Sequence, residues 1–177
     1  VSDLLLYGKE NLVEVRLDNS DNSEVPPGKP QNVLDFSYDG GLYRTAKLSY
    51  HSKLYITNPL LENEIAGGGI LVWYSDVLKK TAKVHYKVHT RNAFESEKEY
   101  TLRISLIDKN GNTVCCEEKA DCLAAGSAKY NEGALLVDSP LLWSPEEPNL
   151  YTLRAEIISE NETVFANDTE IGIRTFE

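Results

Sequence analysis

The sequence predicts an all-β protein whose main part is an antiparallel β-sandwich. Three observations predict this fold class. Apolar residues recur with a period of two rather than about 3.6. Turn-forming residues separate these runs roughly every ten residues. No amphipathic segment is long enough for a substantial helix. Together these features are typical of an immunoglobulin-like antiparallel β-sandwich.

Four segments carry the strand pattern most clearly. Apolar and polar side chains alternate over residues 13–17, 82–88, 100–106 and 151–157. Successive side chains of a strand point to opposite faces of the sheet. Each segment is therefore expected to place one face in a core and the other in water.

Two turns are expected to join neighbouring strands. Residues 108–112 contain Asn110-Gly111, a dipeptide typical of tight hairpins because both residues tolerate positive φ. Residues 159–162 are polar and are expected to form a second hairpin turn. The longest helical feature expected in the chain is one turn within residues 60–66.

The chain is expected to consist of two parts that meet near Leu48. Residues 19–31 are rich in proline, and consecutive prolines cannot donate to a sheet, so this segment is predicted to be a loop. The pattern then becomes strand-like over residues 44–56. We assign residues 1–48 to the first part and residues 49–177, about 130 residues, to one seven-stranded sandwich.

Charge and hydropathy argue against two classes of partner. Lys plus Arg number 18 and Asp plus Glu number 28, so the formal net charge is −10 at pH 7. Such a surface repels nucleic-acid phosphates and anionic membranes. No apolar run reaches the roughly 18 residues that a membrane span needs. The chain begins at Val1 and contains no Met, so we expect it to be an excised part of a longer protein.

The three cysteines are expected to be free thiols. Cys115 and Cys116 are adjacent and would point to opposite faces of a strand. Cys122 falls in a stretch that is expected to be a loop. The sequence has no Cys-x-x-Cys pattern, so zinc and redox sites built on cysteine are not favoured.

Motif spacing predicts neither a catalytic site nor a metal site. The glycines at 67–69 precede a strand rather than a helix, so they are expected to form a flexible loop and not a phosphate cradle. His85 and His89 share a strand face about 13 Å apart, too far to chelate one metal ion, and both are expected to be solvated. Solvation is also expected for three acidic pairs, Glu62 with Glu64, Glu117 with Glu118, and Glu146 with Glu147.

Asp35 stands apart from the other carboxylates as a candidate binding residue. It follows the proline-rich loop and leads into the Gly40-Gly41 turn. An Asp in such a place commonly caps a turn through its own side chain, and composition alone favours this role. The neighbouring Phe36 would be a buried anchor or a face that stacks on a sugar.

Three segments resemble landmarks of glycoside hydrolase family 2, which includes β-galactosidases and β-glucuronidases. Residues 35–44 read Asp-Phe-Ser-Tyr-Asp-Gly-Gly-Leu-Tyr-Arg and resemble the end of the family's jelly-roll sugar-binding domain, with Asp35 six residues before Gly41. Residues 142–151, Leu-Trp-Ser-Pro-Glu-Glu-Pro-Asn-Leu-Tyr, resemble a segment of its immunoglobulin-like domain. Residues 171–174, Ile-Gly-Ile-Arg, resemble the strand that leads to its catalytic barrel.

The resemblance implies domain types and one site residue. Residues 1–48 would supply the last strands of a jelly roll, and residues 49–177 would form the immunoglobulin-like sandwich. Asp35 would contact hydroxyl groups of the substrate's terminal sugar, and in some β-galactosidases the matching Asp also touches a monovalent cation. Trp143 and Tyr151 would be structural, as a core side chain and a strand-corner anchor.

The resemblance also implies the activity of the whole protein. The family's mechanism is retaining, with one barrel Glu that protonates the glycosidic oxygen and another that attacks the anomeric carbon. Neither Glu is expected in this chain, which is therefore expected to be a non-catalytic N-terminal fragment. No metal ligand and no cofactor of its own are expected. A monovalent or divalent cation in the parent enzyme is compatible with the family. The expected partners are the parent's barrel and a terminal β-linked sugar. A homo-oligomer and a cytoplasmic or periplasmic location are left open.

Several identities are compatible with this resemblance. A β-galactosidase is favoured, with β-glucuronidase and β-mannosidase as alternatives, because the barrel residues that choose the sugar are not in the chain. A stand-alone carbohydrate-binding module would need a row of exposed aromatic residues, whereas Tyr and Trp here mostly fall on core-facing positions. A structural spacer would fit residues 49–177 but would leave Asp35 unexplained.

Overall fold

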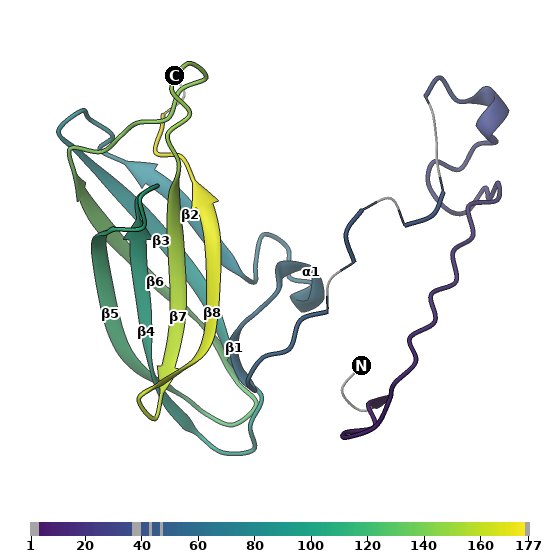
Figure 1. Cartoon of the computed structure of the whole chain (residues 1–177), viewed down its shortest axis with the longest axis horizontal. Helices are drawn as coiled ribbons and strands as arrows, with labels where there is room; N and C mark the ends of the chain where they lie inside the picture. The colour runs from purple at the N-terminus through teal and green to yellow at the C-terminus, as the bar shows by residue number, and fades with distance from the viewer. Residues whose placement is uncertain (1–3, 37–39, 43, 47, 176–177) are drawn as a thin grey trace. The chain divides into compact units, whose positions relative to one another are not determined.

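The chain divides into two compact units. The computed structural model describes residues 4–36, 40–42, 44–46 and 48–175 (Figure 1). The first unit is Val1–Ser49 and the second is Tyr50–Glu177.

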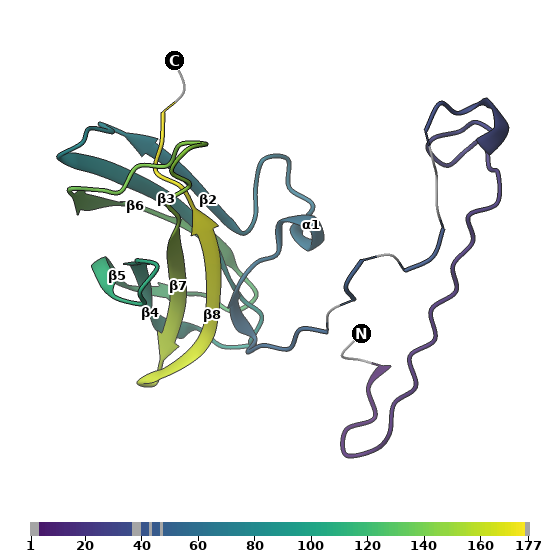
Figure 2. The same cartoon turned by 45° about the horizontal axis from the view of Figure 1, so that its top comes forward.

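The second unit is an antiparallel β-sandwich of two sheets (Figure 2). One sheet holds β1, β2, β3 and β6, and the other has the order β5-β4-β7-β8. Its elements are β1 (Leu54–Ile56), α1 (Pro59–Glu62), β2 (Ile70–Ser75), β3 (Thr81–Asn92), β4 (Lys98–Ile107), β5 (Thr113–Leu123), β6 (Ala128–Asp138), β7 (Tyr151–Ser159) and β8 (Glu162–Ile171). The prediction of an all-β antiparallel fold is confirmed.

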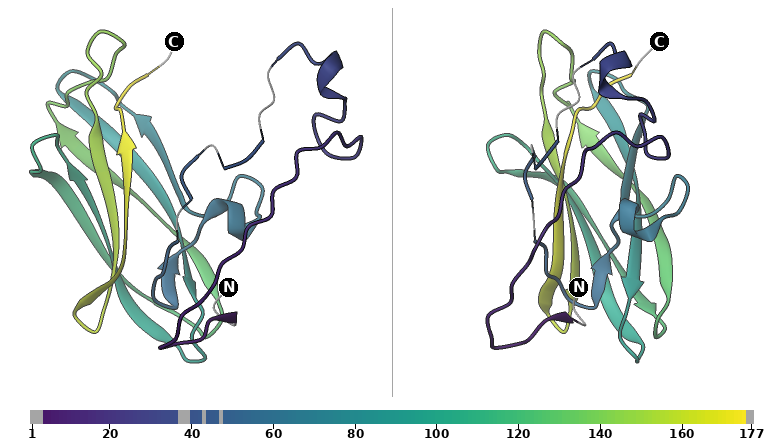
Figure 3. Two further views of the ribbon diagram at one scale, coloured as in Figure 1. Left: turned by 45° about the vertical axis from the view of Figure 1, so that its right-hand side comes forward. Right: turned by 90° about the vertical axis from the view of Figure 1, so that its right-hand side faces the viewer.

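The strands β1 and β2 lie end to end along one edge of β3. β1 pairs with the end of β3, where Ile56 lies opposite Thr90, and β2 pairs with the preceding part, where Ile70 lies opposite Val88. Among the described residues, the sandwich therefore has eight strands, one more than expected, because the strand position along this edge of β3 is split into β1 and β2. The segment between β1 and β2 leaves the sheet and carries α1, which stands out beside this edge (Figures 1 and 3).

The core consists of the alternate side chains that the period of two places on the inner faces. The alternation predicted at 82–88, 100–106 and 151–157 is confirmed in β3, β4 and β7. Each fully buried Leu or Ile contributes about 1.5–3 kcal/mol relative to an exposed side chain. The inward residues of these strands are Ala82, Val84, Tyr86, Val88, Tyr100, Leu102, Ile104, Leu106, Tyr151, Leu153, Ala155 and Ile157.

Both expected hairpin turns are present. In the first, the Asp108 carboxylate accepts hydrogen bonds from the backbone N–H groups of Asn110 at 2.8 Å and Asn112 at 2.9 Å, and Gly111 has a φ of +87°. In the second, Glu160 and Asn161 connect β7 to β8, and both have positive φ. Positive φ at both central residues is typical of the tight hairpin turn whose twist matches that of the strands.

Two expected strands are not formed as predicted. Residues 13–17 are exposed and form no strand, and they pair with no described segment. A single extended segment leaves its backbone groups to water, so a pattern of two alone does not make a strand. In residues 44–56, the described strand is limited to β1.

The first unit is organised by short side-chain contacts rather than by sheets. Its regular element among the described residues is the 3₁₀ helix η2 (Gln31–Val33) within the predicted irregular region. The Asp21 carboxylate accepts a hydrogen bond from the Gln31 N–H at 3.1 Å, which closes the proline-rich loop. The Asp18 carboxylate accepts hydrogen bonds from the hydroxyl and the N–H of Ser20, and these bonds lower the pKa of Asp18.

The helices described in the two units are one turn long. None of them has the length and apolar character that a helix would need to cross a membrane.

The three cysteines are free, as expected, but Cys122 lies in β5 and not in a loop. Cys115 is half-buried, whereas Cys116 and Cys122 are exposed. Burial raises the pKa of the Cys115 thiol to about 11, and negative charge on the neighbouring Cys116 thiolate and on Asp138 adds to the effect.

This difference predicts an order of thiol reactivity. At about pH 8, Cys116 and Cys122 should react with iodoacetamide first, because only the thiolate attacks and Cys115 forms less of it. Peptide mass spectrometry after timed labelling would measure the order. Equal labelling rates at all three positions would contradict the burial and pKa assigned to Cys115.

Candidate functional site

Asp35 lies on the surface of the first unit, just after η2. Leu34 ends this helix in an extended conformation, and Asp35 follows it into a bend. The side chain is exposed and forms no hydrogen bond with the described residues, so the turn-capping bond expected from composition is not seen there. Its carboxylate is available to accept hydrogen bonds from a ligand.

Phe36 extends the same surface. Its side chain is 56% exposed, so it is not the buried anchor considered above. An exposed ring beside a carboxylate combines two features of sugar recognition, a hydrogen-bond acceptor and an apolar face. Tyr38 and Tyr43, which belong to the same motif, lie outside the described residues.

The segment that contains Trp143 and Tyr151 has a structural role. The Tyr151 hydroxyl accepts a hydrogen bond from the Leu141 N–H at 2.9 Å, which fixes the corner where β7 begins. The Trp143 N–H donates to the Ile173 carbonyl at 2.9 Å, and its ring lies 4.6 Å from the Arg174 guanidinium. Trp143 is half-buried rather than part of the core, and it packs closely against Gly172.

The pKa shifts of carboxylates in the described part of the chain differ from those of a general acid. Such an acid needs a raised pKa to hold its proton near neutral pH. Hydrogen bonds from Arg154 lower the pKa of Asp168, and hydrogen bonds from Asn112 and Asn110 lower that of Asp108. The expectation that catalytic carboxylates lie outside this chain remains a prediction.

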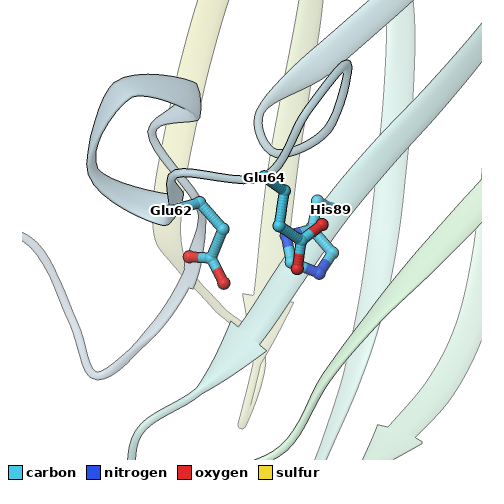
Figure 4. A group of neighbouring side chains, drawn as sticks. All are labelled: Glu62, Glu64 and His89. Carbon is cyan, nitrogen blue, oxygen red and sulfur yellow. The ribbon is translucent and has the colours of Figure 1, made fainter.

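The loop between β1 and β2 brings together two glutamates and a histidine (Figure 4). Asn58 caps α1 by accepting a hydrogen bond from the Leu60 N–H, and Asn63 ends the helix in the left-handed conformation. Glu62 and Glu64 thereby come close to His89 on β3. One ligand atom from each residue lies within 4.8 Å of the other two.

This cluster corrects two expectations of solvation. His89 is 3% exposed because the β1–β2 loop and the ring of Tyr130 cover this part of the outer face of β3, and the two rings stack at 4.2 Å. Glu62 forms an ion pair with Arg91 and is largely buried, whereas Glu64 remains exposed. Strand spacing excluded a metal ion shared by His85 and His89. It could not indicate that His89 lies beside Glu62 and Glu64, because no signal in the sequence pairs His89 with a loop more than twenty residues earlier.

Comparison with known proteins gives one family and a consistent set of relatives. The model of the family "Glycosyl hydrolases family 2" matches residues 70–174. A β-glucuronidase of Formosa agariphila is 24% identical over 179 residues, which cover 98% of this chain. A β-galactosidase of Thermoanaerobacter pseudethanolicus is 24% identical over 178 residues, which cover 100% of it.

A solved structure supports the fold. A β-glucuronidase of Bacteroides uniformis superposes with a TM-score of 0.71 at 20% identity, over 91% of this chain and 18% of its own. The chain spans 18% of the length of the Formosa relative and 22% of that of the Thermoanaerobacter relative. Most of the length of each relative therefore has no counterpart in these 177 residues.

Proposed function

This chain belongs to glycosyl hydrolases family 2, and we propose that it is the non-catalytic part of a retaining exo-glycosidase that removes a terminal β-linked sugar. The proposal assigns the bond-breaking carboxylates to a barrel outside these residues. The sandwich acts as a rigid support, and Asp35 contributes a hydrogen-bond acceptor for the sugar. The observation that supports this role is that the Asp35 carboxylate is exposed and makes no hydrogen bond with the residues that the structure describes.

The chemistry of the reaction supports an enzyme in which the catalytic carboxylates and Asp35 belong to different domains. A retaining glycosidase needs two carboxyl groups about 5–5.5 Å apart, one as acid and one as nucleophile. The pair Glu146 and Glu147 lies in the loop before β7, where both side chains are exposed to solvent. Asp35 by itself can bind and orient a sugar hydroxyl, but it cannot both donate a proton and attack the anomeric carbon.

Two substrates are candidates for the whole enzyme. The sequence resemblance favours a β-galactoside. The names of the relatives give slightly more weight to a β-glucuronide, because they include β-glucuronidases more often than β-galactosidases. The two sugars differ in the group on carbon 5, which is hydroxymethyl in one and carboxylate in the other.

The isolated chain of 177 residues should show neither activity. We expect no release of nitrophenol from p-nitrophenyl β-galactoside or β-glucuronide above the buffer blank, and little or no heat when galactose or glucuronate is titrated in. The parent enzyme, assayed in parallel, provides the positive control. Turnover by the isolated chain would contradict the proposal, and binding at millimolar concentrations or tighter would favour a carbohydrate-binding module instead.

A further inference from the structure

The loop between β1 and β2 is fastened at both ends to a single residue of β3. The Thr57 N–H donates to the carbonyl of His89 at 3.0 Å, and the His89 N–H donates to the carbonyl of Gly69 at 2.9 Å. Gly68 and Gly69 have φ values of +73° and +64°, which glycine adopts without strain. The two ends of the loop are thus held beside His89.

Among the described residues, the imidazole of His89 has a hydrogen-bond partner at only one of its two ring nitrogens. Its Nδ1 lies 3.0 Å from the Thr57 hydroxyl oxygen, which also accepts a hydrogen bond from the Gly69 N–H at 2.9 Å. A hydroxyl oxygen has two lone pairs, so it can accept both protons. In the tautomer that carries the ring proton on Nδ1, the Nε2 lone pair is free, and Nε2 has no hydrogen bond with any residue that the structure describes.

The two carboxylates show the same division of roles. Oε1 of Glu62 bonds to Arg91, and Oε2 of Glu64 accepts a hydrogen bond from the Tyr130 hydroxyl at 2.8 Å. The second oxygen of each carboxylate makes no hydrogen bond with the described residues. Metal-binding side chains are typically held in this way, with one atom bonded to an outer partner and the other directed at the ion.

We propose that Glu62, Glu64 and His89 form a binding site for a divalent first-row transition metal, with zinc as the ion that best fits the ligands. The three ligand atoms lie within 4.8 Å of one another, and His89 is 3% exposed. One imidazole nitrogen with two carboxylate oxygens is a donor set that zinc accepts, whereas calcium and magnesium prefer oxygen alone. A three-residue set leaves a fourth position for water.

Local charge also favours a cation. Glu62 and Glu64 bring two negative charges together, and Arg91 is the cation that forms an ion pair with one of them in the described part of the chain. Among the described residues, Glu62 forms its ion pair with Arg91 and not with His89. A bound dication would join the β1–β2 loop to β3 and would stabilise the sandwich, and this role does not depend on the proposed glycosidase function.

The test is zinc binding to the metal-free chain, measured by isothermal titration calorimetry. All samples carry Cys116→Ser and Cys122→Ser, because these exposed thiols can bind zinc on their own. We expect one zinc ion per chain and a rise in Tm that EDTA reverses. Glu64→Gln should weaken zinc binding at least about tenfold, since it removes the charge but keeps an oxygen that accepts the Tyr130 proton.

Two further variants make the result specific. His89→Gln should also weaken binding at least about tenfold, and Glu146→Gln combined with Glu147→Gln should leave it unchanged, because this exposed acidic pair lacks a histidine. If His89→Gln fails to fold by circular dichroism, Glu64→Gln decides the test alone. The site is refuted if the chain binds no zinc in a one-to-one ratio, or if Glu64→Gln binds zinc as tightly as the unmutated site.

Discussion

Replacing Asp35 with alanine in the full-length parent enzyme should lower kcat/KM by about tenfold or more. The expected loss corresponds to one hydrogen bond between an ionised carboxylate and a sugar hydroxyl, which is worth about 1.5–3 kcal/mol. Because the Asp35 side chain is exposed and bonds to none of the described residues, its removal should leave the free energy of unfolding nearly unchanged. Steady-state kinetics with p-nitrophenyl β-galactoside and β-glucuronide would measure the effect.

Two control variants separate a sugar contact from a general effect on the first unit. Asp35→Asn keeps the shape of the side chain and one acceptor oxygen, so it should lose less than Asp35→Ala. Asp18→Ala removes a carboxylate that bonds to Ser20 in the same unit, and it should leave kcat/KM unchanged. Unaltered kinetics in Asp35→Ala would show that this residue does not contact the substrate.

Gly133→Ala should destabilise the sandwich by about 2–4 kcal/mol, the cost of overpacking together with one disturbed hydrogen bond. Gly133 on β6 lies directly opposite Tyr86 on β3, and the Tyr86 ring lies over it. A methyl group at Gly133 would lie 2.5 Å from Cζ of Tyr86 and 2.7 Å from Oε2 of Glu117. Tyr86 is fully buried and donates a hydrogen bond to Glu117 at 2.7 Å, so neither group can move without loss.

Urea unfolding of the chain, followed by circular dichroism, would measure this cost. Ala134→Ser changes the next residue of β6 on the exposed face and should stay within about 0.5 kcal/mol of the original chain. Tyr86→Phe removes the hydroxyl, so combining it with Gly133→Ala should cost less than the sum of the two single changes. Strictly additive costs would contradict the close packing of Tyr86 on Gly133.

The parts of the fold that sequence predicts well are those in which burial follows local pattern. β3, β4 and β7 have neighbours on both sides within their sheets, and their inner faces carry unbroken alternate apolar residues. β5 is an edge strand, and its half-buried positions include Glu117, Lys119 and Asp121. A polar edge strand does not show apolar alternation, which explains why Cys122 was expected in a loop.

The errors in the prediction come from contacts between distant residues. Residues 13–17 have a strand pattern but lack a partner in the described structure, and a partner cannot be inferred from a segment's own residues. His89 lies on the outer face of β3, where a polar residue is expected to be solvated, yet Tyr130 and the β1–β2 loop cover it. The cluster with Glu62 and Glu64 depends on this coverage, so the sequence alone did not predict it.

Covalent labelling of the full-length protein tests most directly whether this chain is the support of a retaining β-glycosidase. A 2-deoxy-2-fluoro β-galactoside or β-glucuronide with a good leaving group traps the glycosyl-enzyme intermediate on the nucleophile. Peptide mass spectrometry should find one labelled Glu with one of the two reagents, and this Glu should lie outside the 177 residues of this chain. A label on any residue within them, or no label with either reagent, would contradict the account.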